Sequence, residues 1–228
     1  MILFRQLFDP STWTYTYLLA DPVTRDAIII DPVLEQTERD LAVIAEMGVN
    51  LRYILETHVH ADHITGGGKL RHSTGAKFVA GAGTELDCAD ILMAEGEVLA
   101  FGNEVIRSIC TPGHTDGCTS YAWRNCLFTG DTLLIDACGR TDFQQGCAKK
   151  MYASLQKLLS YPDETLIYPA HDYNGRHVSS VAQEKEINPY VVGLDQAGFE
   201  KKMQELNLPH PRFIHVAVPG NLKCGEVE

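Results

Sequence analysis

Short runs of β-forming side chains, separated by turn residues, occupy the first quarter of the chain. Residues 14–20 and 27–31 are rich in β-branched and aromatic side chains, and the segment between them, 21–26, carries the proline and aspartates of a turn. A third apolar run, 51–56, leads directly into a segment rich in histidine. The pattern predicts strands at these three positions, the first two joined as a hairpin.

Helical spacing of apolar residues appears between and after these strands. In 35–47, apolar side chains fall on one face, and Gly48 follows as a stop signal. The same criteria predict helices over 64–73, 151–159, 178–187 and 196–206, strands over 77–80 and 165–168, and hairpins pairing 98–101 with 104–110 and 119–123 with 126–129. A proline-rich tail follows the last helix. Strand-rich halves with intervening helices predict two sheets packed together with helices outside.

The composition is that of a globular protein with an apolar core. Of its 228 residues, 45% are hydrophobic and 21% are charged. The formal net charge of −11 disfavours binding to phosphate backbones and anionic lipid. No apolar run approaches the roughly 18–20 residues that cross a bilayer, and residues 1–9 do not have the pattern of a secretory signal. We therefore expect no nucleic-acid or membrane binding, and a bacterial cytoplasmic location or, for a processed eukaryotic form, the mitochondrial matrix.

The seven cysteines predict neither a zinc site nor a disulfide framework. Their number is odd, and none of them form a C-x-x-C pair. In a reducing compartment such thiols are ordinarily free and buried. We therefore expect reduced cysteines throughout.

The strongest chemical signal is the segment His58-Val-His-Ala-Asp-His63. Three imidazoles and one carboxylate lie within six residues, and these are the ligands that suit zinc, iron and manganese. A surface histidine cluster is the alternative interpretation. The preceding strand and the three glycines at 66–68 favour a loop at a metal site instead.

Three later loops have the same form, with a metal-ligating residue directly after a predicted strand. His114 lies in a Pro-Gly turn, Asp131 follows a strand and a glycine, and His171 follows a strand and a proline. Each of these signals is weak alone, because single polar residues in loops usually cap helices or contact water. Together with the His58 segment they predict a catalytic centre built from loops along one edge of the sandwich.

In its motifs the chain resembles the metallo-β-lactamase superfamily. The motifs are T-H-x-H-x-D-H at 57–63, P-G-H-T at 112–115, F-T-G-D at 128–131 and P-A-H at 169–171, in this order. The resemblance implies an α+β fold, the αββα sandwich, with a metal centre at the edge between the sheets. It also implies that residues 1–228 form one such domain with a short helical C-terminal tail. Because the superfamily supports many reactions, the fold alone does not define the function.

Within the superfamily the chain is most similar to the persulfide dioxygenase, or sulfur dioxygenase, family. The segments that carry this similarity are 138–147, 168–173, 207–211 and 217–225. Glyoxalase II, a two-metal thioester hydrolase that also uses glutathione, is expected to have a longer helical C-terminal region. We expect no appended rhodanese domain.

The resemblance implies one Fe(II) per chain, held by His58, His114 and Asp131. Two histidines and one carboxylate on one face leave coordination positions open for other ligands. With one carboxylate the Fe(II) site has a net charge of +1, which can accept a thiolate-like anion. The implied reaction is oxidation of glutathione persulfide by O2 to sulfite and glutathione, in a chain that forms a homodimer or larger assembly.

The same motifs contain more potential ligands than one iron requires. His60, Asp62, His63 and His171 orient the iron ligands by hydrogen bonds if the site has one metal. In a binuclear glutathione thioester hydrolase they would complete two sites, with Asp131 as the bridge. The ligand motif alone leaves both interpretations open. A metal-binding or scaffold protein without activity is a third alternative, disfavoured by the complete ligand set.

Substrate contacts follow less directly from the sequence. Glutathione brings two carboxylates, and the planar guanidinium of Arg140 can bind one of them at two points, or can form a structural ion pair with Asp142. Tyr173 and Arg176 follow His171 closely enough to reach the substrate, although a structural tyrosine is also compatible with the pattern. Cys224 enters the candidate site because the family's tail folds back towards the metal; the alternative is an inert terminal thiol.

Overall fold

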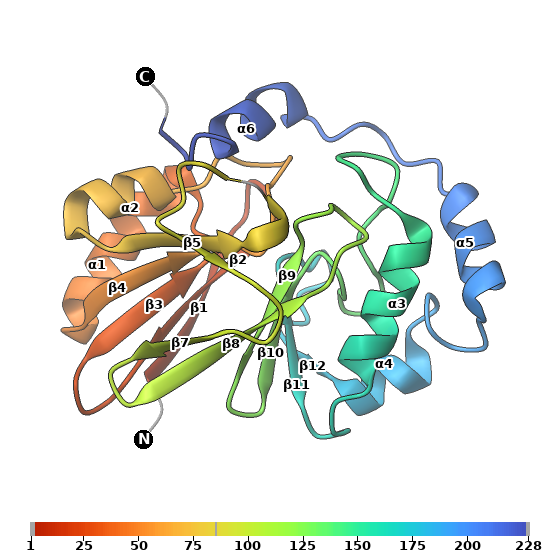
Figure 1. Ribbon diagram of the computed structural model, residues 1–228, viewed down its shortest axis with the longest axis horizontal. Helices are drawn as coiled ribbons and strands as arrows, with labels where there is room; N and C mark the ends of the chain where they lie inside the picture. Colours follow the sequence, from red (N-terminus) through yellow and green to blue (C-terminus); the bar gives the residue numbers. More distant parts are fainter. Residues whose placement is uncertain (1–2, 85, 227–228) are drawn as a thin grey trace.

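Two six-stranded sheets face each other at the centre of the molecule, with helices on both outer faces (Figure 1). The computed structural model describes residues 3–84 and 86–226. Strand order is β1-β2-β3-β4-β5-β6 in one sheet and β12-β11-β10-β9-β8-β7 in the other. The α+β sandwich predicted from the sequence is confirmed.

The first sheet is built from residues 3–93 in chain order. Its strands are β1 (Leu3–Asp9), β2 (Thr14–Ala20), β3 (Asp26–Ile30), β4 (Asn50–Leu55), β5 (Lys77–Gly81) and β6 (Ile91–Met93). Strands β3 to β6 pair in parallel, which requires helical crossovers between them. The connecting elements are η1 (Leu34–Gln36), α1 (Thr37–Met47), α2 (Gly67–Thr74) and η2 (Ala82–Thr84).

The second sheet is mostly antiparallel. Its strands are β7 (Val98–Phe101), β8 (Glu104–Cys110), β9 (Thr119–Trp123), β10 (Cys126–Gly130), β11 (Leu166–Pro169) and β12 (Ser179–Ser180). Strands β10 and β11 pair in parallel, and α3 (Ala148–Leu159) is the crossover between them. The remaining helices are α4 (Val181–Ile187), α5 (Gln196–Gln204) and α6 (Ile214–Asn221).

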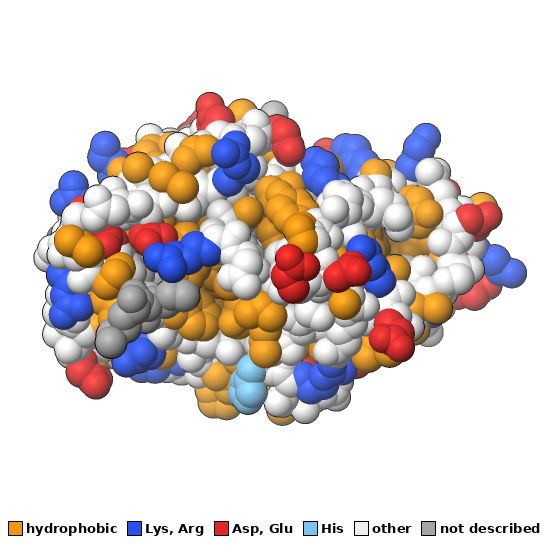
Figure 2. All heavy atoms as spheres, turned by 90° about the horizontal axis from the view of Figure 1, so that it is seen from below, with side chains coloured by type: hydrophobic (Ala, Val, Ile, Leu, Met, Phe, Trp, Pro, Cys, Tyr) orange, Lys and Arg blue, Asp and Glu red, His pale blue; other side chains and the backbone are white. Residues whose placement is uncertain are grey.

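Apolar side chains fill three layers, as the alternation along the strands requires. Aromatic residues dominate the layer between the sheets, where Tyr17, Tyr121 and Phe128 are almost completely buried. A second layer lies between the first sheet and helices α1 and α2, and a third between the second sheet and helices α3 and α5. Acidic and basic side chains are interspersed over the face shown in Figure 2. The charge of the chain is therefore not gathered into a single-sign patch on that face.

Most predicted elements are confirmed, with shifts at their ends. The strands over 14–20 and 119–123 and the hairpin of 98–101 with 104–110 have the predicted bounds. Three short or terminal strands, β1, β6 and β12, were not predicted. The sequence predicted no helix in the proline-rich tail, whereas Ile214–Asn221 is the helix α6, with Pro219 inside it. Proline inside a helix removes one intrahelical hydrogen bond, and Pro219 stands in the last turn of α6.

The prediction that all cysteines are reduced was also wrong. Cys88 and Cys224 form a disulfide across a sequence separation of 136 residues. The other five cysteines are free. Spacing along the chain does not reveal this pair, because the C-terminal tail brings its cysteine to the first sheet only in the folded protein.

In residues 3–84 and 86–226 we find no helix with the length and apolar character of a membrane span.

Candidate metal centre

The four predicted loops lie together at one edge of the sandwich. His58 follows β4 of the first sheet, whereas His114, Asp131 and His171 follow β8, β10 and β11 of the second. Strands from both sheets end at this edge, so their loops converge there. The arrangement along one edge that the sequence predicted is the one observed.

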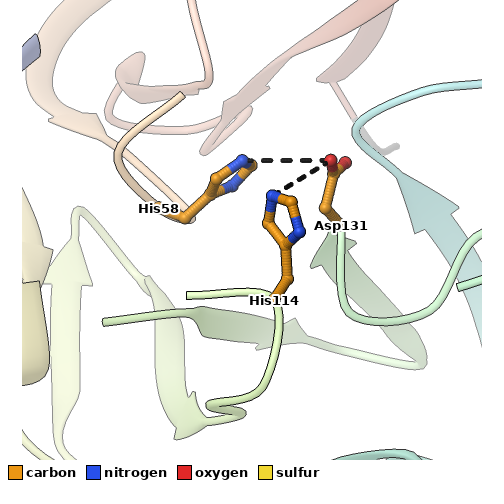
Figure 3. Close-up of side chains that lie close together, drawn as sticks. All are labelled: His58, His114 and Asp131. Carbon is orange, nitrogen blue, oxygen red and sulfur yellow. Dashed lines mark ion pairs between the residues drawn. The ribbon is translucent and has the colours of Figure 1, made fainter. Parts of the chain in front are cut away.

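His58, His114 and Asp131 point towards a common centre (Figure 3). The Nε2 atom of His58 lies 4.0 Å from Oδ2 of Asp131, and Nε2 of His114 lies 3.6 Å from the same oxygen. A metal ion about 2.0–2.2 Å from each donor would place its ligands about 3–4 Å apart. The three side chains therefore fit one metal ion, and they come from both sheets.

Hydrogen bonds from neighbouring residues orient the imidazole of His58. Its Nδ1 lies 3.0 Å from Oγ1 of Thr57, and that hydroxyl donates to Oδ2 of Asp31 at 2.8 Å. Because the hydroxyl proton is used on Asp31, Nδ1 of His58 donates and Nε2 carries the free lone pair. Burial, then the neighbouring His60 and His114, hold the pKa of His58 well below its usual range. A neutral imidazole with a free Nε2 is what a metal ligand requires.

The imidazole of His114 is oriented by backbone atoms. Its Nδ1 lies 2.7 Å from the carbonyl oxygen of Arg140. A carbonyl only accepts, so Nδ1 carries the proton and Nε2 is free to face Asp131. Gly139 allows this approach: a Cβ there would lie 2.2 Å from the carbonyl oxygen of Asp131 and 3.1 Å from Cγ of His114. The backbone of the Gly139–Arg140 pair, rather than a side chain, shapes this side of the centre.

The Nε2 atom of His60 faces two buried carboxylates, and its Nδ1 faces Asp62 at 3.9 Å. Its Nε2 lies 3.2 Å from Oδ1 of Asp31 and 3.3 Å from Oε2 of Glu56. Burial alone would lower the pKa of His60, but these two carboxylates raise it well above its usual range. An imidazolium held in this way stabilises the two buried carboxylates.

Asp62, His63 and His171 lie beside Asp131 on its other side. Nε2 of His171 is 3.6 Å from both Oδ1 of Asp131 and Oδ2 of Asp62, and Nδ1 of His63 is 2.9 Å from Oδ2 of Asp62. Burial lowers the pKa of His171, but Asp131 and Asp62 raise it above its usual value. These residues lie beside Asp131, and whether they orient it or bind a second metal stays a prediction.

Three buried atoms around the centre lack a hydrogen-bond partner. They are Oδ1 of Asp131, Nε2 of His63 and Nδ1 of His60. Such orphaned polar atoms are rare inside proteins and usually meet a water, an ion or a ligand. Together with the donor set, they fit a metal-binding centre.

A cavity of about 460 Å³ opens over the centre and is lined by both site residues and the C-terminal segment. Arg140 lines it, but all of its nitrogens are engaged: Nε and Nη2 lie 2.7 Å from the two carboxylate oxygens of Asp142, and Nη1 donates to the carbonyl of Pro209. The ion pair between Arg140 and Asp142 that the sequence offered as an alternative is thus the observed arrangement.

The other candidate substrate residues lie in different surroundings. Tyr173 lines the cavity, is 62% exposed and stacks on His171 with ring centroids 6.1 Å apart. Arg176 pairs with Asp136 and is not among the lining residues. Cys224 is bonded to Cys88 and buried in the layer beneath helices α1 and α2. Its expected position as a free thiol beside the metal is therefore corrected.

Sequence reasoning missed the residues that orient the ligands. Asp31 ends the apolar run 27–31 and was read only as the end of a strand. Thr57 is the first residue of the motif at 57–63, but it was assigned no role of its own. Asn221, which donates to the carbonyls of His60 and His63, lies in the segment 217–225 that carries the family similarity, and it too was assigned no role.

Comparison with known proteins agrees with this geometry. A model of the metallo-beta-lactamase superfamily matches residues 14–171. Persulfide dioxygenase ETHE1, mitochondrial, from Mus musculus is 47% identical over 230 residues, which span 98% of this chain and 89% of that protein. A crystal structure of ETHE1 from Myxococcus xanthus superposes with a TM-score of 0.96 at 48% identity, covering 98% of this chain and 100% of that one.

A hydrolase gives a weaker and partial match. Hydroxyacylglutathione hydrolase from Rhodospirillum rubrum is 36% identical over 169 residues, 72% of this chain and 64% of that protein. The match to the dioxygenases extends over almost the whole length, including the C-terminal segment that lines the cavity. The chain therefore belongs to the persulfide dioxygenase family of the metallo-β-lactamase superfamily.

Proposed function

We propose that this protein is an Fe(II)-dependent dioxygenase that oxidises glutathione persulfide with O2. One observation carries the proposal: a His-His-Asp cluster joins the two sheets in a chain 47% identical to a persulfide dioxygenase over 98% of its length. In the balanced reaction, the persulfide, O2 and water give glutathione, sulfite and two protons. The outer sulfur loses four electrons, and O2 accepts them.

His58, His114 and Asp131 would hold the iron, since their donor atoms fit one ion and face one side. When bound, Fe(II) supplies open coordination positions and the electrons with which triplet O2 reacts, which zinc cannot supply. Thr57 and the Arg140 carbonyl keep both Nε2 atoms aimed at that position. His171 and Asp62 lie where they can hold or move a proton beside Asp131.

The position of His60 is compatible with one metal or two. Its Nε2 faces Asp31 and Glu56 at 3.2 and 3.3 Å, whereas its Nδ1 has no hydrogen-bond partner and lies 3.9 Å from Oδ1 of Asp62. A second metal bound by Asp62 and His63 would meet this Nδ1 without moving Nε2 from the two carboxylates, so the metal count has to be measured.

A binuclear thioester hydrolase remains the second candidate, because Asp62, His63 and His171 gather beside Asp131 and a hydroxyacylglutathione hydrolase matches part of the chain. An anaerobic metal count followed by two assays separates the candidates. We expect one iron per chain and oxygen uptake with glutathione persulfide. Two metals per chain with hydrolysis of a lactoylglutathione-type thioester would contradict the proposal.

We propose that Arg140 contacts a remote carboxylate of the substrate, which must then replace or share its bond with Asp142. Arg140→Ala should raise KM more than it lowers kcat if the contact is equal in ground and transition states. Asp142→Ala is the matched variant: it frees the guanidinium and should lower KM. If both variants leave KM unchanged and reduce only stability, the ion pair is structural.

We propose weaker roles for the remaining candidates. Tyr173 is placed to contact the bound substrate from the cavity wall, whereas Arg176 reaches it only if its pair with Asp136 opens. A homodimer and a location in the bacterial cytoplasm or mitochondrial matrix are further proposals from the family resemblance. The mouse relative is named mitochondrial, and the Myxococcus relative is bacterial.

A further inference from the structure

One side chain from the C-terminal helix holds the loop that carries the first metal-ligand motif. Asn221, at the end of α6, donates from Nδ2 to the carbonyl oxygens of His60 at 2.9 Å and His63 at 2.8 Å. Its Oδ1 accepts from the backbone nitrogen of Thr65 at 2.8 Å. Helix α6 lies at the top of the molecule in Figure 1, beside the loop that follows β4.

The three backbone groups depend on this amide. Within the described part of the chain, no backbone group bonds to the His60 or His63 carbonyl or to the Thr65 nitrogen, and Asn221 itself is only 4% exposed. A primary amide supplies two donors and an acceptor on one rigid plane. Losing it would leave these buried backbone groups without a hydrogen-bond partner, which destabilises this position of the loop.

The segment after Asn221 is docked closely against the same loop. Gly225 has φ +75°, and a Cβ there would lie 2.3 Å from the carbonyl oxygen of Thr65. Gly68 meets the tail in the same way, since a Cβ on it would lie 3.0 Å from the Gly225 backbone. The Cys88–Cys224 disulfide joins this segment to the first sheet. The close packing at Gly68 and Gly225 and the disulfide at Cys224 thus hold the segment that follows Asn221 in place.

We propose that Asn221 is a positioning residue for the metal centre. It fixes the backbone from 60 to 65, and through that backbone the turn that sets His58 opposite His114 and Asp131. The loop has no helix or strand of its own between β4 and α2, so an external partner is needed to hold it. This inference rests on the proposed function for the assignment of His58 as a ligand.

Metal affinity, measured apart from turnover, tests the proposal. Asn221→Ala removes all three bonds, and Asn221→Asp keeps an acceptor for Thr65 but places a carboxylate oxygen against two carbonyls. Both should weaken Fe(II) binding by about 10–100-fold, the usual effect of residues that orient metal ligands. Gly225→Ala, which displaces the tail without altering the amide, should give a smaller loss. Competition with a chelator measures the affinity, and the visible spectrum of the Co(II)-substituted protein reports ligand geometry.

A matched control separates positioning from general stability. Asn188 is equally buried, and its amide also makes three hydrogen bonds, to Ala137, Glu184 and Tyr190. Asn188→Ala should lower the melting temperature comparably but leave the Co(II) spectrum and Fe(II) affinity unchanged.

The inference is overturned if Asn221→Ala keeps the parental affinity and spectrum, or if Asn188→Ala loses them to the same degree. If the parent protein binds Fe(II) but takes up no oxygen, the proposed function is refuted. The Fe(II) affinities and Co(II) spectra of the Asn221 and Asn188 variants still test the positioning role in that case.

Discussion

The two sides of the metal centre are held in different ways. On the first-sheet side, the loop after β4 depends on partners distant in sequence: Asp31 beneath it and Asn221 from the tail. On the second-sheet side, backbone groups of one nearby segment hold both ligands. The amide of Gly139 donates to the carbonyl of Asp131 at 2.8 Å, and the carbonyl of Arg140 orients His114.

This difference separates two kinds of sensitivity to mutation. On the second-sheet side, metal binding should weaken when the local backbone is changed, because backbone groups approach the ligands closely there. On the first-sheet side, metal binding should weaken when long-range contacts are removed. The contact between Asn221 and His60, for example, joins residues 161 positions apart in sequence.

Removing any one ligand tests whether both sides serve the same ion. We expect His58→Ala, His114→Ala and Asp131→Ala each to abolish stoichiometric iron binding and oxygen uptake, because two remaining ligands hold Fe(II) weakly. Metal analysis after desalting and an oxygen electrode provide the measurements. If one of these variants still binds one iron per chain, the residue that was replaced is not an iron ligand.

Gly139→Ala tests the second-sheet side alone. The added methyl group would lie 2.2 Å from the Asp131 carbonyl oxygen, so the backbone must move and take the Arg140 carbonyl with it. We expect a loss of Fe(II) affinity of about 10–100-fold, measured by chelator competition. As a control, Gly75→Ala strains a backbone with φ +74° but meets nothing within 4 Å of its Cβ position; equal losses of Fe(II) affinity in both variants would argue against close approach as the cause.

Reducing the Cys88–Cys224 disulfide tests the first-sheet side. The bond closes a loop of 136 residues, so its loss should lower the free energy of unfolding by about 2–5 kcal/mol. Urea unfolding of the protein with and without reductant gives the value, and Cys88→Ser should reproduce the reduced state. If reductant lowers the free energy of unfolding of Cys88→Ser as much as that of the parent, loss of the disulfide is not the cause of the decrease.

The smallest expected effect concerns Asp40 on α1, which is remote from the proposed metal ligands. Burial raises the pKa of Asp40 from 3.8 to about 6, although Arg39 opposes the shift. Between these values the folded chain keeps a proton that the unfolded chain releases, so stability falls as pH rises from about 4 to 6 and levels off above.

Asp40→Asn should remove this decline, a difference of roughly 1–3 kcal/mol between parent and variant across that range. Urea unfolding at pH 4 and pH 7 measures it. Parallel pH profiles of the two proteins would show that Asp40 is ionised in the folded state. Iron affinity at pH 7 should be the same in both, which confines the effect to stability.

The sequence predicted what depends on local pattern. The run 27–31 and the hairpin of 98–101 with 104–110 were readable from alternation and turn residues, and the position of His58 directly after a strand placed it at the sandwich edge. It did not predict α6, because Pro219 masks a helix that packing stabilises. Nor did it predict the contacts of Cys224 and Asn221, since only the fold brings these residues to the first sheet.

Because the proposed ligands come from both sheets, iron supply would affect how much of the protein stays folded. An ion that binds only the native chain adds RT ln(1 + [M]/Kd) to its stability, about 2.7 kcal/mol at one hundred times Kd. A cell short of iron would therefore contain a protein that is inactive and also more often unfolded and open to proteolysis. The abundance of the enzyme would then follow the metal that it uses.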